Sequence, residues 1–589
     1  MLPFAAREPV ALFDDNHVEQ RARLLHGRVD TIECDAPDAL AAAFARIDAA
    51  TAAGHWVALA TAYELGYALE PRLAPLRPAS PTPLLRAWVF AHCTELDDPA
   101  CDAWLAGQDD GQPTGLMDHH AELAEADYLR AIERIKRYIL DGDCYQTNFT
   151  FPSHAQAYGN PWRLYRKLRQ AQPVRYGALI LHADGALMSR SPELFVARRG
   201  SLLTCKPMKG TAPIDAPPSA LTASEKNRAE NLMIVDLLRN DLGRLAPPGG
   251  VSVPALFEAE AYRTVWQMTS TITAAPVLAP LADIFRALYP CGSVTGAPKI
   301  RAMQIIRELE AGPRGIYCGA VGWIAPSGDF QFNVPIRTLD IAAHGALRCH
   351  TGSGIVHDSD PAGEWDECRL KLRFLQQMPA DLRLIETLRC EPGAGAVYPW
   401  LDDHLARLTA SATALGFGCA PAAVREALAA AARGLSGTHR VRLSLGQAGD
   451  IDITAEPLAP LAGDQTITLS SERLDSTDPL LPHKTTARRL YDAALPPAMA
   501  AGHFDTLFFN ERDELTEGCR STVFVQLDGQ VYTPPVDAGL LHGICRRREL
   551  RAGRASERTI SRAELLRAER IWLGNALRGR FEVRLASGG

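Results

Sequence analysis

The sequence lacks the features that would place this protein in a membrane, outside the cell or along nucleic acid. No stretch reaches the roughly 18–20 apolar residues of a membrane-spanning helix, and no basic segment followed by an apolar core marks a signal peptide. Positive charge is not in excess, because 62 Lys and Arg face 69 Asp and Glu and leave a net charge of −7. That balance argues against nucleic-acid and membrane-surface binding.

Paired cysteines are missing as well. The 13 cysteines are scattered and no C-x-x-C occurs, so neither a disulfide scaffold nor a zinc site is predicted. Reduced, buried thiols are typical of a cytoplasmic protein. What the chain does have is an ordinary globular composition, 47% apolar and 22% charged, over 589 residues. This length predicts at least two domains, and we expect a cytoplasmic enzyme.

Helix-like and strand-like segments alternate along the chain. Apolar spacing predicts a helix over about 125–141, and a capping-box pattern predicts another that opens at Thr222–Glu225. The alternating stretch CYQTNFTF predicts a strand with Tyr145 and Phe149 on one face and Gln146 on the other. Strands are also predicted at 176–182, 317–325 and 330–337. The interleaving indicates an α/β (α+β) fold. The connector-like segments are 71–83, 106–119 and 373–382, and the main boundary is predicted near residue 380.

Several charged residues fall in patterns that suit an anionic substrate. On a helix, Glu364, Glu367 and Lys371 would share one face, which could hold a divalent cation or could be a solvated, ion-paired surface. A glycine turn, Gly352–Gly354, precedes them, and its amides could approach an anion. The segment 292–299 is rich in glycine and ends in a lysine, but it lacks the G-K-[ST] ending of a phosphate loop, so nucleotide binding is rejected.

Seven motifs together resemble the chorismate-binding enzymes, which include anthranilate synthases, aminodeoxychorismate synthases and isochorismate synthases. The motifs are GDCYQTNF, SPELF, KPMKGTAP, AENLMIVDLLRNDLGR, GSVTGAPK, FNVPIRTL and GSGIVHDSDPAGEWDECRLK. The resemblance covers about 120–378, with 1–115 as the N-terminal part of the same unit. It implies an α/β sandwich, Mg²⁺ and chorismate. By the same resemblance, Glu230 and Glu367 would bind Mg²⁺ directly and Glu364 through water, while Asn227 stands where relatives often have an acid.

The resemblance also implies roles in substrate binding and catalysis. Glu193 would be the general acid for the leaving 4-hydroxyl, because hydroxide is a poor leaving group. The substrate-binding residues would be Arg337, Lys371, Tyr317, Gly352, Gly354, Thr295 and Gly296. Isochorismate-forming relatives have a lysine base in place of Gln146, so this chain is expected to favour ammonia over water. Lys209 resembles the nucleophile of the para-specific enzymes, with Lys206 or the metal lowering its pKa. Alternatively, Lys209 would only bind a carboxylate of the substrate.

The segment 383–589 has motifs of a different kind: LIETLR, DHLARL, HKTT, LTEG and GLLHGICR. Together they resemble the class IV (branched-chain type) aminotransferase fold, and more narrowly its aminodeoxychorismate lyase branch, which implies pyridoxal phosphate. Lys484 would carry the cofactor, Glu517 would pair with its ring nitrogen, and Arg407 with the amides of Gly543 and Ile544 would bind its phosphate. Thr522 stands where many relatives have Asn, which leaves one cofactor hydrogen bond open.

The two halves lead to one expected pathway. The first would convert chorismate and ammonia to 4-amino-4-deoxychorismate, and the second would release pyruvate to give 4-aminobenzoate, a folate precursor. No glutamine amidotransferase signature is found, so a separate subunit would supply the ammonia. A homodimer through the second half is a further expectation. The alternatives are an anthranilate synthase joined to an amino-acid transaminase, and a second half that binds cofactor without turnover.

Overall fold

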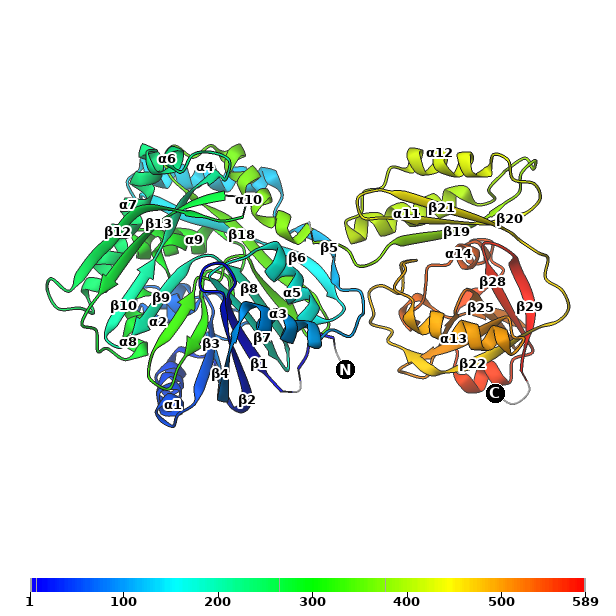
Figure 1. Ribbon diagram of the computed structural model, residues 1–589, viewed down its shortest axis with the longest axis horizontal. Coiled ribbons are helices and arrows are strands. Elements are labelled where there is room, and N and C mark those ends of the chain that lie inside the picture. Colours follow the sequence, from blue (N-terminus) through cyan, green and yellow to red (C-terminus); the bar gives the residue numbers. More distant parts are fainter. Residues whose placement is uncertain (1–2, 7, 264, 377, 587–589) are drawn as a thin grey trace. The chain divides into compact units, whose positions relative to one another are not determined.

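A computed structural model describes residues 3–6, 8–263, 265–376 and 378–586 (Figure 1). The chain divides into two units, one of Met1–Gly111 with His119–Met378, the other of Gln112–Asp118 with Pro379–Gly589. Strand β5 (Gly115–Ala121) straddles this division, because 115–118 fall in the second unit and 119–121 in the first. Among the described residues, no helix is both long and apolar enough to cross a membrane.

The first unit is built on an 18-stranded sheet. Its described pairings are antiparallel, and β6 is joined to both β14 and β18. The strands are β1 (Val10–Asp15), β2 (Arg21–Cys34), β3 (Trp56–Thr61), β4 (Leu85–Asp97), β5 (Gly115–Ala121), β6 (Gln146–Tyr158), β7 (Tyr176–His182), β8 (Gly185–Ser191), β9 (Leu194–Arg199), β10 (Leu202–Lys206), β11 (Met208–Pro213), β12 (Val251–Ala261), β13 (Val265–Ala274), β14 (Gly296–Ala297), β15 (Ala320–Ile324), β16 (Phe330–Asn333), β17 (Thr338–Ala342) and β18 (Ala346–Ile355).

Helices cover this sheet, and their buried stripes form its cores. One core joins Tyr128, Ile132 and Ile135 to Phe149 and Trp365, which is the stripe that the sequence predicts. The helices are α1 (Leu40–Ala52), α2 (Leu65–Leu69), α3 (Asp98–Gly107), α4 (Glu125–Leu140), α5 (Pro161–Ala171), α6 (Pro218–Thr222), α7 (Glu225–Gly243), α8 (Leu281–Leu288), α9 (Lys299–Leu309) and α10 (Pro361–Gln376).

Two local predictions are wrong. The N-cap of α7 is Ser224, whose hydroxyl accepts a hydrogen bond from the Asn227 amide at 3.4 Å, whereas Thr222 ends the short helix α6. Tyr145 precedes β6 and is 71% exposed, so it does not share the buried face of Phe149. Both errors place a residue one turn or one step outside its element, where local patterns discriminate poorly.

The second unit contains two sheets. One has three antiparallel strands, and the other has eight strands that include the parallel pairs β22–β23 and β22–β29. The elements are β19 (Leu384–Cys390), α11 (Leu401–Leu415), α12 (Pro421–Ala432), β20 (His439–Leu445), β21 (Ile451–Pro457), β22 (Gln465–Leu474), α13 (Arg489–Ala500), β23 (Asp505–Asn510), β24 (Leu515–Gly518), β25 (Thr522–Leu527), β26 (Gln530–Thr533), α14 (Ile544–Arg551), β27 (Ser556–Glu557), α15 (Arg562–Leu566), β28 (Arg570–Asn575) and β29 (Gly579–Leu585).

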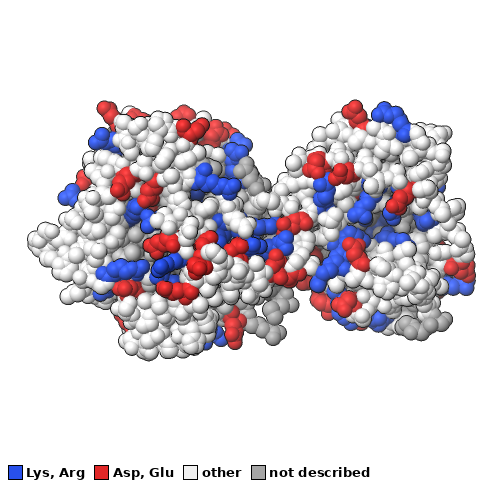
Figure 2. Space-filling model, viewed as in Figure 1, with Lys and Arg blue, Asp and Glu red and all other residues white. Residues whose placement is uncertain are grey.

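Apolar residues of the larger sheet form the core of this second unit. Leu507, Phe509, Val523 and Leu573 are fully buried in one cluster, and a smaller cluster joins α13 to β23. On the face shown in Figure 2, Lys and Arg side chains are interspersed with Asp and Glu. This distribution agrees with a protein whose net charge is −7.

Candidate functional site

In the first unit, three segments bring the predicted glycines together. Gly354 on β18 lies opposite Asn148 on β6, and Gly296 on β14 lies opposite Thr147 on the same strand. Gly296 has φ +137°, and a Cβ there would collide with the backbone carbonyl of Gln146. Only glycine fits such a close backbone approach. The strand that starts at Gln146 thus joins both glycine segments.

The side-chain ends of Lys209 and Gln146 both approach Gly354. A Cβ on Gly354 would lie 2.9 Å from Nε2 of Gln146 and 3.0 Å from Nζ of Lys209, so glycine leaves room for both groups. Gln146 is fully buried, and among the residues that the structure describes neither atom of its amide has a hydrogen-bond partner. Buried polar groups are seldom left unpaired. The amide therefore marks a position where a polar ligand would be satisfied.

The electrostatic surroundings suit Lys209 as a neutral amine. Burial lowers the pKa of Lys209, Lys371 lowers it further, and the carboxylates of Glu230 and Glu193 oppose the shift. Lys206 is not among the main groups that shift this pKa, and its ammonium is paired with Glu260. Desolvation by the strands around Lys209 is the main cause.

Glu193 lies between β8 and β9 and is buried. Burial raises the pKa of its carboxyl, while a hydrogen bond from Ser293, the charge of Lys209 and the Met208 amide oppose the rise. The Met208 amide is 3.5 Å from Oε1 of Glu193. Ser293 was not predicted as a site residue, although it falls inside the GSVTGAPK motif. A buried carboxyl with a raised pKa can hold the proton that a general acid needs.

Three glutamates lie near Lys209 but do not form a closed metal site. Burial raises the pKa of Glu230 on α7, the charges of Lys209 and Lys226 oppose the rise, and the carboxylates of Glu364 and Glu367 on α10 add to it. Glu367 is ion-paired with Lys371 at 2.7 Å, and Glu364 accepts a hydrogen bond from Ser359 at 2.8 Å. Within the described ranges, no three His, Cys, Asp or Glu side chains are placed to hold a metal ion.

The other predicted substrate residues have specific partners. Nζ of Lys371 also donates to the carbonyl of Gly352 at 2.8 Å, which fixes the ammonium at the glycine turn. Tyr317 is buried, and its ring stacks on His350 with centroids 5.2 Å apart. Thr295 donates from its hydroxyl to the Cys291 carbonyl at 2.8 Å. Arg337 is described below, because its surroundings carry a separate argument.

In the second unit, Lys484 is a buried amine. Burial lowers its pKa to about 7, with the charges of Arg488 and Arg407 adding to the shift and those of Glu386 and Glu517 opposing it. The Lys484 carbonyl accepts a hydrogen bond from the Ile385 amide at 2.8 Å, which ties it to β19. An amine with a pKa of about 7 is about half neutral at pH 7, and the neutral form is the nucleophile.

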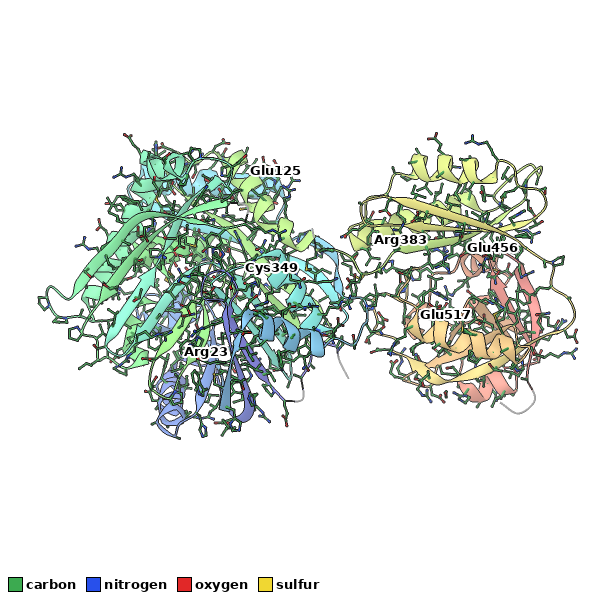
Figure 3. The ribbon with its side chains drawn as sticks, in the orientation of Figure 1. Arg23, Glu125, Cys349, Arg383, Glu456 and Glu517 are labelled. Atoms are coloured by element: carbon green, nitrogen blue, oxygen red, sulfur yellow. The ribbon has the colours of Figure 1, made fainter. Side chains whose placement is uncertain are left out.

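Glu517 lies on β24, within the C-terminal unit (Figure 3). The hydroxyl of Tyr491 donates to its Oε1 at 2.8 Å, and the Leu541 amide donates at 3.2 Å. Burial raises the pKa of Glu517, while these hydrogen bonds and the charge of Lys484 oppose the rise. Tyr491 was not predicted; it lies seven residues after Lys484 and orients the carboxylate.

A buried arginine and backbone amides lie together at the start of α14. Arg407 is buried and pairs with Glu386 at 2.6 Å, and its Nη1 lies 3.4 Å from the His542 carbonyl. Gly543 is the N-cap of α14, and a Cβ there would be 2.7 Å from the Thr522 hydroxyl. Amides at a helix start bind phosphate groups well.

Arg547, also on α14, was not predicted. Burial lowers its pKa and the charge of Arg407 lowers it further, while its Nε has no hydrogen-bond partner in the described part of the chain. Two guanidinium groups close to one another are stabilised by an anion. The donor set of Arg407, Arg547 and the start of α14 therefore fits a phosphate, and Lys484 with Glu517 fits the rest of pyridoxal phosphate.

Comparisons with known proteins agree with this geometry. The family model of the chorismate binding enzyme matches residues 8–377, and the chain belongs to this family. The family model of amino-transferase class IV matches residues 383–586. The chain is therefore a mixed α/β protein in which a chorismate-binding fold precedes a class IV aminotransferase fold.

Curated relatives and a solved structure match parts of the chain. The chain is 42% identical over 267 residues to aminodeoxychorismate synthase component 1 of Klebsiella aerogenes, covering 44% of this chain and 59% of the relative. It is 39% identical over 288 residues to the Escherichia coli (strain K12) protein of the same name, covering 47% and 63%. Anthranilate synthase component I of Streptococcus pneumoniae TIGR4 has the same fold, with 23% identity, a TM-score of 0.52 and coverage of 62% and 92%. The chain spans about three fifths of the first two relatives.

Proposed function

We propose that this chain is a bifunctional enzyme that makes 4-aminobenzoate from chorismate. The first unit would replace the 4-hydroxyl of chorismate with ammonia, giving 4-amino-4-deoxychorismate and water. The second would eliminate pyruvate from that product and leave 4-aminobenzoate. The single observation that carries the proposal is the pair Lys209 and Glu193. Burial pushes their pKa values in opposite directions, which poises one as nucleophile and the other as acid.

The first reaction needs a nucleophile and a proton donor. The neutral amine of Lys209 would add to C2 of chorismate as the 4-hydroxyl leaves, and Glu193 would donate the proton that turns hydroxide into water. Ammonia would then add at C4, and the bond between Lys209 and C2 would break. Gln146 offers no base to activate water, so its buried amide favours ammonia as the second nucleophile.

The carboxylates of Glu230, Glu364 and Glu367 have the hard oxygen donors that Mg²⁺ prefers. The carboxylates of Glu364 and Glu367 raise the pKa of Glu230, although Lys209 and Lys226 lower it, so a cation among the three carboxylates would stabilise their charged forms. We propose that these residues hold Mg²⁺ after Glu367 separates from Lys371. The ion would supply positive charge next to a substrate carboxylate, and Lys371 would then be free to bind the same dianion.

In the second unit, pyridoxal phosphate would supply an electron sink. Arg407, Arg547 and the amides of Gly543 and Ile544 would bind its phosphate, and Glu517 would bind its ring nitrogen. Lys484 would remove the proton at C4 of the substrate and return a proton to the departing enolpyruvyl group. Aromatisation of the ring drives this elimination.

Three wider proposals concern partners and location. Ammonia would come from glutamine through a separate amidotransferase subunit, and the second unit would form a homodimer. A cytoplasmic location is proposed because all 13 cysteines are free and 11 of them are buried, as expected where thiols stay reduced.

Product identification tests the proposed function. The purified chain is incubated with chorismate, Mg²⁺, ammonium salt and pyridoxal phosphate, and products are separated by chromatography and identified by mass spectrometry. We expect 4-aminobenzoate and pyruvate. Aminodeoxychorismate without pyruvate would refute the lyase assignment, and anthranilate would refute the para-specific role of Lys209.

A further inference from the structure

Arg337 is a half-buried cation with an unusual backbone conformation. Its φ is +51°, which costs a non-glycine residue backbone energy and requires support from neighbours. Burial lowers the pKa of its guanidinium, and Tyr262 is the group that opposes this shift. Across the described parts of the chain, no carboxylate forms an ion pair with it. A half-buried cation without a counter-ion is ready for an anionic ligand.

The guanidinium is instead oriented by a neutral amide. Nη1 of Arg337 donates to Oε1 of Gln172 at 3.3 Å. Gln172 is the C-cap of α5, where its side chain is carried by the end of a rigid helix. An amide oxygen can orient a cation without cancelling its charge, whereas a carboxylate would also neutralise it.

A buried hydrogen-bond network holds the backbones of Gln172 and Arg337. The Gln172 carbonyl accepts hydrogen bonds from Nε and Nη2 of Arg190 at 3.2 and 3.1 Å, and the Arg190 amide donates to the Arg337 carbonyl at 3.0 Å. Arg190 is fully buried and bridges to Asp14 at 2.9 Å. One rigid arginine therefore sets the backbone of both Gln172 and Arg337.

We propose that Gln172 is a positioning residue that holds the Arg337 guanidinium, with its charge intact, to bind a carboxylate of the substrate. This inference rests on the proposed function, because that function defines the substrate as the dianion chorismate. Arg337 touches the substrate and Gln172 acts through it. Three residues before Arg337, the Val334 amide donates to the carbonyl of Glu193, the proposed general acid, at 3.1 Å.

The test is chorismate binding by titration calorimetry with Mg²⁺ present. Gln172→Leu is expected to raise Kd by about 10- to 100-fold, the range for a hydrogen bond to a charged group. Gln172→Glu should weaken binding further, because its carboxylate would compete with the substrate. Gln108→Leu, an exposed glutamine of the same unit, is the control and should match wild type. Turnover of added aminodeoxychorismate by the second unit should not change in any of them.

A double variant separates positioning from general damage. In an Arg337→Lys background, Gln172→Leu should have little further effect on Kd, since the group that it orients has been replaced. A Kd within twofold of wild type for Gln172→Leu, or an equal loss in both backgrounds, would overturn the inference. If wild type binds chorismate but does not aminate it, the proposed function fails while the role of Gln172 is still tested. No chorismate binding by wild type would overturn both.

Discussion

At the scale of single residues, Glu193 gives the sharpest prediction. Glu193→Gln keeps the shape and removes the acidic proton, so kcat for aminodeoxychorismate formation should fall by about 10²–10⁴-fold with little change in KM, as expected for a general acid. The measurement is a steady-state assay by chromatography at saturating ammonium. A loss confined to KM would show that Glu193 binds the substrate and does not donate a proton.

Lys209 and Glu193 together predict the pH dependence of the first reaction. The pKa of Lys209 is lowered, so its reactive neutral form is present above that pKa and is lost as pH falls through it. The pKa of Glu193 is raised, so its acidic form is present below that pKa and is lost as pH rises through it. A bell-shaped profile of kcat/KM is expected, and Glu193→Gln should lack the alkaline limb. An unchanged alkaline limb would exclude Glu193 as its origin.

Lys484 predicts a pH dependence that can be measured without substrate. Its pKa is about 7, so the neutral amine predominates above pH 7 and is protonated as pH falls through that value. The initial rate of pyridoxal phosphate attachment to the apo-protein, trapped with borohydride and located by peptide mass spectrometry, should rise from pH 6 to 8 and then level. A rate that keeps rising to pH 10 would indicate an ordinary, solvated lysine.

At the scale of elements, the two glycines that line β6 predict opposite kinds of damage. Gly296→Ala would force a Cβ onto the backbone of β6 at a φ of +137°, which should lower the free energy of unfolding by about 1–3 kcal/mol. A Cβ on Gly354 would first meet the side-chain ends of Gln146 and Lys209, which can shift more easily than backbone, so Tm should change little while kcat falls. Thermal unfolding and the amination assay compare the pair. Equal Tm values for both variants would contradict this account.

Elements with a local apolar pattern could be predicted from the sequence, whereas contacts between distant elements could not. Helix α4 and strand β7 were predicted closely, because local spacing of apolar residues determines both. Ser293 beside Glu193, and Arg547 beside Arg407, were not, since these contacts join residues that are distant in the chain. Burial of Gln146 and the ion pair between Lys206 and Glu260 likewise depend on packing that no local pattern encodes.

At the scale of the whole molecule, two separate active sites predict complementation. A Lys209→Ala variant should make no aminodeoxychorismate but should convert added aminodeoxychorismate, and a Lys484→Ala variant should accumulate that intermediate. Because the intermediate is a free small molecule in the proposed pathway, mixing the two variants should restore 4-aminobenzoate after a lag. The lag should shorten as the concentration of the Lys209→Ala variant rises, since that variant supplies the second step. If the mixture stays inactive while each variant retains its own half-reaction, transfer of the intermediate must occur within one molecule.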